Sequence, residues 1–241
     1  MIPKYNIALV VFVICISIHA QNNKIFISAE LDTLNHELKT EQKIVFYNTS
    51  NDVLKHIYLH DWSNSFKNNK TPLGKRFIEN YKKEFYFADD NERGYTNIHT
   101  LKIDNQRMPF NRLVKQQDVI EIALKSELQP RDSIVISSTY ITKLPSARFT
   151  GYGKTRDGYH LRYWYLVPAV YDSDWNIMSH LNMDDLYEDI ASYEINLSLP
   201  KNYVLESNLY QYKTNNKQSS DYYLVGQQKK NIILNINKNK R

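Results

Sequence analysis

Apolar and polar residues alternate in short stretches along most of the chain, and only 6 glycines and 7 prolines interrupt the 241 residues. Alternation with a period of two places one face of a strand in a core and the other toward water. It predicts strands at 25–32, 41–48, 54–59, 96–103, 108–110, 119–124, 133–140, 193–200, 203–207, 222–226 and 231–237. The predicted fold is therefore all-β: a twisted antiparallel β-sandwich, or saddle-like sheets.

One segment has a helical period instead. Leu73, Phe77, Tyr81 and Phe85 recur every four residues, with charged residues between them. This spacing aligns the four side chains on one face of a helix. Thr71 and the proline after it suit a helix start. We predict one peripheral helix over about 73–86, whose aromatic stripe packs against the sheet edge.

The first twenty residues have the pattern of a signal peptide. Lys4 precedes the apolar run 7–18, which is too short to cross a bilayer comfortably, and Ala20 offers a small residue for cleavage. The single cysteine, Cys15, lies inside this segment, so the mature chain would contain no disulfide. We expect a secreted or periplasmic protein with residues 1–20 as signal peptide, 21–241 as one β domain and no membrane span after cleavage. The alternative is an uncleaved anchor helix.

Composition and charge exclude two further classes of protein. The hydrophobic content of 42% is enough to build a core, which excludes a disordered chain. The formal net charge is +5, but the basic residues are scattered among 26 acidic ones. Nucleic-acid binding needs a basic face with interleaved aromatic residues. We therefore predict no nucleic-acid partner.

Motifs for catalysis and metal binding are missing from the sequence. It contains neither H-E-x-x-H nor G-x-S-x-G. His56 and His60 would lie about 13 Å apart in a strand, too far for one metal ion. Asp172, Asp174 and Asp184 could form a loose calcium site, or cap turns as such residues commonly do. We predict no catalytic residue, no metal ligand and no cofactor, with the histidines in surface or turn positions.

The stretch from Arg162 to Tyr203 carries the most specific pattern. It reads RYWYLVPAVYD, then an acidic-aromatic link, then the strand YEINLSLPKNYV. This resembles the end of the N-terminal β domain of the aminopeptidase-N family of zinc metallopeptidases, the gluzincins. A second, weaker pattern of that domain is met by Gln42, Ile44, Phe46, Asn48, Ser50, Asp52, Leu54, Ile57, Leu59 and His60.

The resemblance implies a non-catalytic domain. In that family zinc lies in the following domain, and a G-x-M-E-N segment, absent here, binds the free amine of the substrate. A peptidase domain or a peptide is then the expected partner; a stand-alone secreted binding module is the alternative. The candidate domain interface consists of Tyr163, Trp164, Tyr165, Pro168, Tyr171, Asp172 and Trp175. These aromatic residues could instead pack within the β domain. A large exposed apolar patch would favour docking, and a closed polar surface would favour the stand-alone module.

Overall fold

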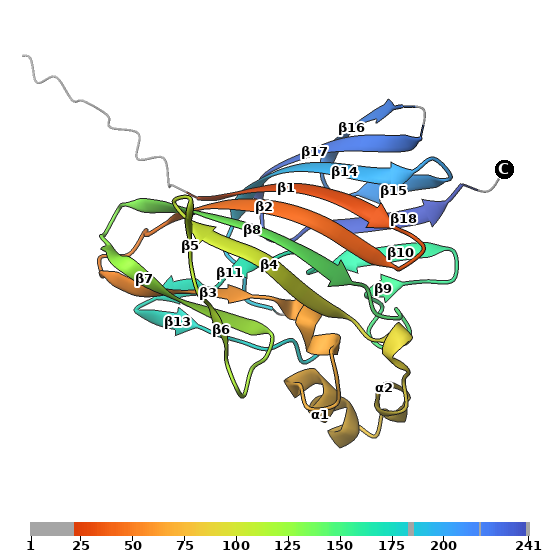
Figure 1. Cartoon of the computed structure of the whole chain (residues 1–241), viewed down its shortest axis with the longest axis horizontal. Helices are drawn as coiled ribbons and strands as arrows, with labels where there is room; N and C mark the ends of the chain where they lie inside the picture. The colour runs from red at the N-terminus through yellow and green to blue at the C-terminus, as the bar shows by residue number, and fades with distance from the viewer. Residues whose placement is uncertain (1–21, 183–185, 217, 240–241) are drawn as a thin grey trace, which may run out of the picture.

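The computed structural model describes residues 22–182, 186–216 and 218–239. The predicted signal peptide and Cys15 lie outside these residues. No helix in the described part is long and apolar enough to cross a membrane. The described chain is predominantly β-structure, which confirms the predicted fold class (Figure 1).

An eight-stranded sheet dominates the fold, in the order β16-β17-β14-β1-β2-β8-β4-β5. Its strands are β1 (Asn23–Asp32), β2 (Glu37–Tyr47), β4 (Tyr95–Ile103), β5 (Gln106–Arg107), β8 (Ser133–Lys143), β14 (Ala191–Pro200), β16 (Tyr210–Asn215) and β17 (Ser219–Lys229). Neighbours pair antiparallel, except that β1 and β14 are parallel. A parallel pair needs a long crossover, and here most of the chain forms it.

Two four-stranded sheets lie below the large sheet in Figure 1. One contains β9 (Gly153–Lys154), β10 (Gly158–Arg162), β15 (Tyr203–Ser207) and β18 (Ile233–Lys238). The other contains β3 (Leu54–His60), β6 (Asn111–Arg112), β7 (Val119–Leu128) and β11 (Val167–Pro168). A small hairpin joins β12 (Val170–Asp172) to β13 (Asp174–Asn176). One hydrophobic cluster connects the buried faces of the sheets.

Helical structure differs from the prediction of one helix over 73–86. The segment forms α1 (Pro72–Glu79) and α2 (Lys83–Tyr86), beside the 3-10 turns η1 (Trp62–Phe66) and η2 (Asp90–Glu92). Thr71 caps α1 by accepting a hydrogen bond from the Gly74 N–H at 3.1 Å, as expected for its start. The end of α1 was not predicted. Tyr81 adopts a left-handed φ of 57° there, and the Lys82 N–H donates to the Phe77 carbonyl.

This C-terminal capping arrangement ends a helix whatever its apolar period. It turns Tyr81 out of the predicted stripe, and its side chain is 87% exposed. Leu73, Phe77 and Phe85 are buried, so the packing role of the stripe holds for these three residues.

Two smaller segments also differ from their predictions. The residues 108–110 are not a strand but lie between the short strands β5 and β6. The polar tract 213–220, for which no strand is predicted, contributes residues to both β16 and β17. Polar residues suit β16 because it is an exposed edge strand.

Candidate functional site

The aromatic run, Tyr163 to Tyr165, lies in the core and not on the surface. These side chains are only 5%, 1% and 2% exposed in chain order. Pro168 is buried as well. For these four residues of the predicted interface, the packing alternative describes their position.

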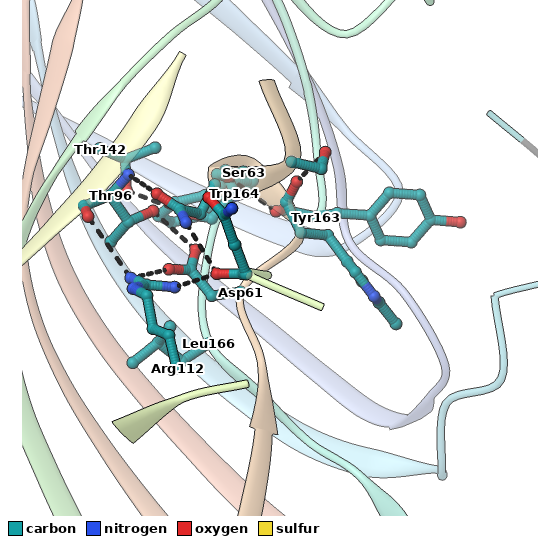
Figure 2. Close-up of polar contacts among 12 residues, drawn as sticks. Asp61, Ser63, Thr96, Arg112, Thr142, Tyr163, Trp164 and Leu166 are labelled. Atoms are coloured by element: carbon teal, nitrogen blue, oxygen red, sulfur yellow. Dashed lines mark hydrogen bonds and ion pairs between the residues drawn. The ribbon is translucent and has the colours of Figure 1, made fainter. Parts of the chain in front are cut away.

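Buried polar side chains hold the backbone of the aromatic run in place. The Gln42 side-chain amide donates to the Leu166 carbonyl at 2.7 Å and accepts from the Leu166 N–H at 3.1 Å. The Tyr140 hydroxyl donates to the same Gln42 oxygen at 2.6 Å. Ser63 donates to the Tyr163 carbonyl at 3.0 Å (Figure 2). Because the run is irregular, these side chains satisfy backbone groups that no sheet partner reaches.

An ion pair lies beside this segment, as Figure 2 shows. Arg112 on β6 donates to the Asp61 carboxylate at 2.6 Å, and the Asp61 side chain is only 2% exposed. The Thr96 hydroxyl donates to the other carboxylate oxygen at 2.6 Å. The network joins β4, β6 and the residue before η1. It was not predicted, because its members are far apart in the sequence.

The segment 177–182 is fixed by a second buried acid and a buried histidine. The Asp118 carboxylate accepts from the Ser179 hydroxyl at 2.7 Å and from the His180 N–H at 2.8 Å. His60 accepts from the Met178 N–H at 3.2 Å. Burial lowers the pKa of His60 to about 3, so its imidazole is neutral, and burial raises the pKa of Asp118 to about 6.

The expectation that the histidines occupy surface or turn positions is therefore wrong for two of them. His60 is fully buried and His180 is 5% exposed. The ring of His60 stacks on Trp62, with centroids 4.7 Å apart. Sequence reasoning gave no indication of this stacking, because either residue could face solvent in a strand pattern. His60 and Asp118 support the segment 177–182 through the hydrogen bonds that they accept from it.

The β12–β13 hairpin carries the remaining three residues of the predicted interface. Tyr171 and Trp175 are half-buried, and Asp172 is exposed. The Tyr171 and Trp175 rings pack edge to face at 5.2 Å, and Trp175 also contacts Tyr58 at 5.5 Å. Tyr171 donates to Asp52 at 3.1 Å. An amphipathic aromatic hairpin of this kind can contact a second protein surface.

One acidic residue of the hairpin, Asp174, shows turn chemistry. Asp174 accepts from the Trp175 N–H at 2.7 Å. Asp184, the third member of the calcium alternative, lies outside the described residues. Within the described part of the chain, no group of three or more His, Cys, Asp or Glu side chains is placed to hold a metal ion.

Glu188 is a buried acid whose ionised form is destabilised by its surroundings. It is 4% exposed, and its Oε2 has no hydrogen-bond partner among the described residues. Burial raises the pKa of Glu188 from its ordinary value of 4.5 to about 8, against the opposing effect of Arg162 and Lys230. Between about pH 4.5 and pH 8, the Glu188 carboxyl is therefore protonated in the folded state and ionised in the unfolded state.

Stability should consequently fall as the pH rises from about 4.5 to 8. We expect Glu188→Gln to stabilise the protein by about 1–3 kcal/mol at pH 8 and to change little near pH 4. Urea unfolding at a series of pH values measures this. The exposed Glu30→Gln should leave the pH profile unchanged. If Glu188→Gln showed the same pH dependence of stability as the unsubstituted protein, the assignment of a buried, protonated carboxyl would be contradicted.

Comparisons with known proteins find similarity at the level of structure. No family model and no curated protein matches the sequence. The solved M1 zinc metallopeptidase from Deinococcus radiodurans superposes with a TM-score of 0.53 at 10% identity, over 90% of this chain and 41% of that chain. A mutant of that enzyme gives 0.50 at 9% identity, and the mutant bound to a Tyr-Ser-Ala substrate gives 0.50 at 8%.

The fold is thus that of the N-terminal β domain region of M1 zinc metallopeptidases, which confirms the predicted resemblance for the fold. This chain spans about two fifths of the length of those structures, as the coverage of 41% states. At a sequence identity near 10%, the comparison shows similarity of fold only.

Proposed function

We propose that this chain is a non-catalytic, peptidase-associated β domain that packs against a zinc peptidase domain and helps to position peptide N-termini. The observation that carries the proposal is the match of 90% of this chain to 41% of an M1 zinc metallopeptidase. Zinc would then be held by the partner domain and not by this chain. Export by a signal peptide to the periplasm or beyond belongs to the same proposal.

The β12–β13 hairpin is the proposed contact with the partner domain. Its residues Tyr171, Asp172 and Trp175 are the accessible part of the predicted interface. The buried aromatic run precedes the hairpin directly and is hydrogen-bonded to β2 and η1. This support restricts the hairpin, so less conformational entropy is lost when it docks.

A stand-alone secreted binding module is the second candidate. It is favoured by the burial of Trp164 and its neighbours, since these residues form no exposed apolar patch. The two candidates differ in whether a zinc peptidase domain binds the hairpin.

Peptidase assays test the first proposal. With zinc present, the chain alone should give no chelator-sensitive hydrolysis of aminoacyl chromogenic substrates; such hydrolysis would contradict the non-catalytic assignment. The DNA that follows the Arg241 codon should encode an H-E-x-x-H segment. That domain, expressed separately, should bind this chain and gain peptidase activity.

Alanine variants of the hairpin locate the contact. Tyr171→Ala together with Trp175→Ala should weaken the complex by about tenfold or more, since aromatic residues dominate interface energies. The control Tyr210→Ala removes an aromatic ring that is 80% exposed on β16 and should not weaken it. The absence of any encoded zinc domain would favour the stand-alone module.

A further inference from the structure

A cavity of about 650 Å³ opens at the end of the large sheet, away from the hairpin residues. It lies where the β1–β2 turn meets the end of β8 and the residues around β9. Its lining includes four basic side chains and one carboxylate: Lys143, Arg148, Lys154, Arg156 and Glu92. The formal charge of this lining is therefore about +3 at neutral pH, in a protein whose charges are otherwise mixed.

Lys154 is held in the cavity by a relay of two side chains. Its ammonium lies 2.7 Å from His36 Nε2, and His36 Nδ1 lies 2.7 Å from the Tyr159 hydroxyl. An ammonium can only donate, so Nε2 must accept and the imidazole must be neutral, with its hydrogen on Nδ1. Tyr159 is 3% exposed, so the relay is anchored in the core.

The backbone at Lys154 is equally constrained. The Lys154 N–H donates to the Pro145 carbonyl at 2.7 Å, and the Lys154 carbonyl accepts from the Ala147 N–H at 2.8 Å. Gly153 has a φ of +112°, and a Cβ there would lie 2.0 Å from the Pro145 oxygen. Only glycine allows the two segments to approach this closely. The backbone contacts at Gly153 and Lys154 therefore fix the position of Lys154.

Two cations of the cavity donate to neutral groups. Lys143 donates to the Asn35 carbonyl, and Lys154 donates to the His36 imidazole. The single lining carboxylate, Glu92, is already paired with Arg148 at 2.7 Å. The positive charge of the two lysines is thus not compensated by an acid in the lining.

The pKa of the His36 imidazole is lowered, in part by this excess of positive charge. Burial lowers its pKa, and Lys154, Lys143 and Lys238 lower it further, while Asp32 opposes them. The positive charges of Lys143 and Lys154 repel one another, and a bound anion would offset this repulsion. The cavity has room for such an anion together with part of an attached molecule.

We propose that this cavity binds a doubly charged oxyanion, specifically a phosphate group, between Lys143, Lys154 and Arg156. Lysine ammonium groups act as point charges for phosphate, and a guanidinium adds a planar, two-pronged donor. The hydroxyls of Ser146 and Thr155 also line the cavity and can donate to the remaining oxygens. This site is independent of the proposed docking to a peptidase domain.

Isothermal titration of the chain with inorganic phosphate at constant ionic strength tests the site. We expect saturable binding that weakens by about tenfold or more in Lys154→Gln and in Arg156→Gln. The control Lys75→Gln removes one exposed cation from α1 and should leave the affinity within about twofold. Glycerol phosphate, titrated in parallel, shows whether a phosphate monoester or free phosphate is preferred.

A second readout separates binding from a structural role of the lysine. Phosphate should attract Lys154 and neutralise its charge, so the pKa of His36 followed by NMR should rise when phosphate is added. Absence of saturable binding would overturn the proposal. Equal weakening by Lys75→Gln, or equally tight binding of acetate at matched ionic strength, would overturn it too, because either result describes nonspecific attraction.

Discussion

Replacing Trp164 with alanine should lower the free energy of unfolding by about 3–5 kcal/mol. The side chain is 1% exposed and packs edge to face on Tyr165 at a centroid distance of 5.5 Å. Its removal leaves a cavity that the surroundings fill only in part, because the run is tied to Gln42 and Ser63 by hydrogen bonds. Chemical denaturation followed by tyrosine fluorescence or circular dichroism measures the loss.

Trp175→Ala is the matched control for this substitution. Trp175 is half-buried on the β12–β13 hairpin, so the same chemical change removes less buried area there. We expect less than half the loss found for Trp164→Ala. An equal or larger loss for Trp175→Ala would show that the hairpin, and not the aromatic run, is the structural part of the motif.

Replacing Asp61 with alanine should cost about 3 kcal/mol or more in the free energy of unfolding. The carboxylate is 2% exposed and is bound by Arg112 and by Thr96. Its loss leaves the guanidinium, which is only 23% exposed, without its anion, and leaves a buried hydroxyl without its acceptor. Breaking a buried pair on one side costs more than the pair contributes, because the remaining charge stays poorly solvated.

Glu92→Ala provides the comparison for an exposed pair. The Arg148–Glu92 pair has the short distance of 2.7 Å, but its side chains are 48% and 34% exposed. We expect a change within about 1 kcal/mol. If the two variants lost similar stability, burial would not be what gives the Asp61 network its importance.

These expectations divide the sequence motif into two parts with different tasks. The aromatic run and Pro168 fill the core, so they determine whether the domain folds. Tyr171, Asp172 and Trp175 remain accessible on a supported hairpin, so substitutions there test docking with a smaller effect on folding. A motif that looks uniform in sequence thus combines a structural segment with a candidate contact.

The sequence by itself determined the strand pattern and the family of folds. Tyr193, Ile195, Leu197 and Leu199 alternate with polar residues, and they are buried in β14 as this period predicts. Such a pattern is readable because neighbouring side chains of a strand point to opposite faces whatever the strand pairs with. The start of α1 at Thr71 and Pro72 is equally local.

Only the tertiary structure decided which polar residues meet. Asp61 with Arg112, Asp118 with His180, and Lys154 with His36 are far apart in the sequence but in contact in the fold. The tertiary structure also decided that β1 and β14 are parallel and that the aromatic run lies in the core. The period of a strand states which residues share a face, but burial and charge depend on what the rest of the chain places against that face.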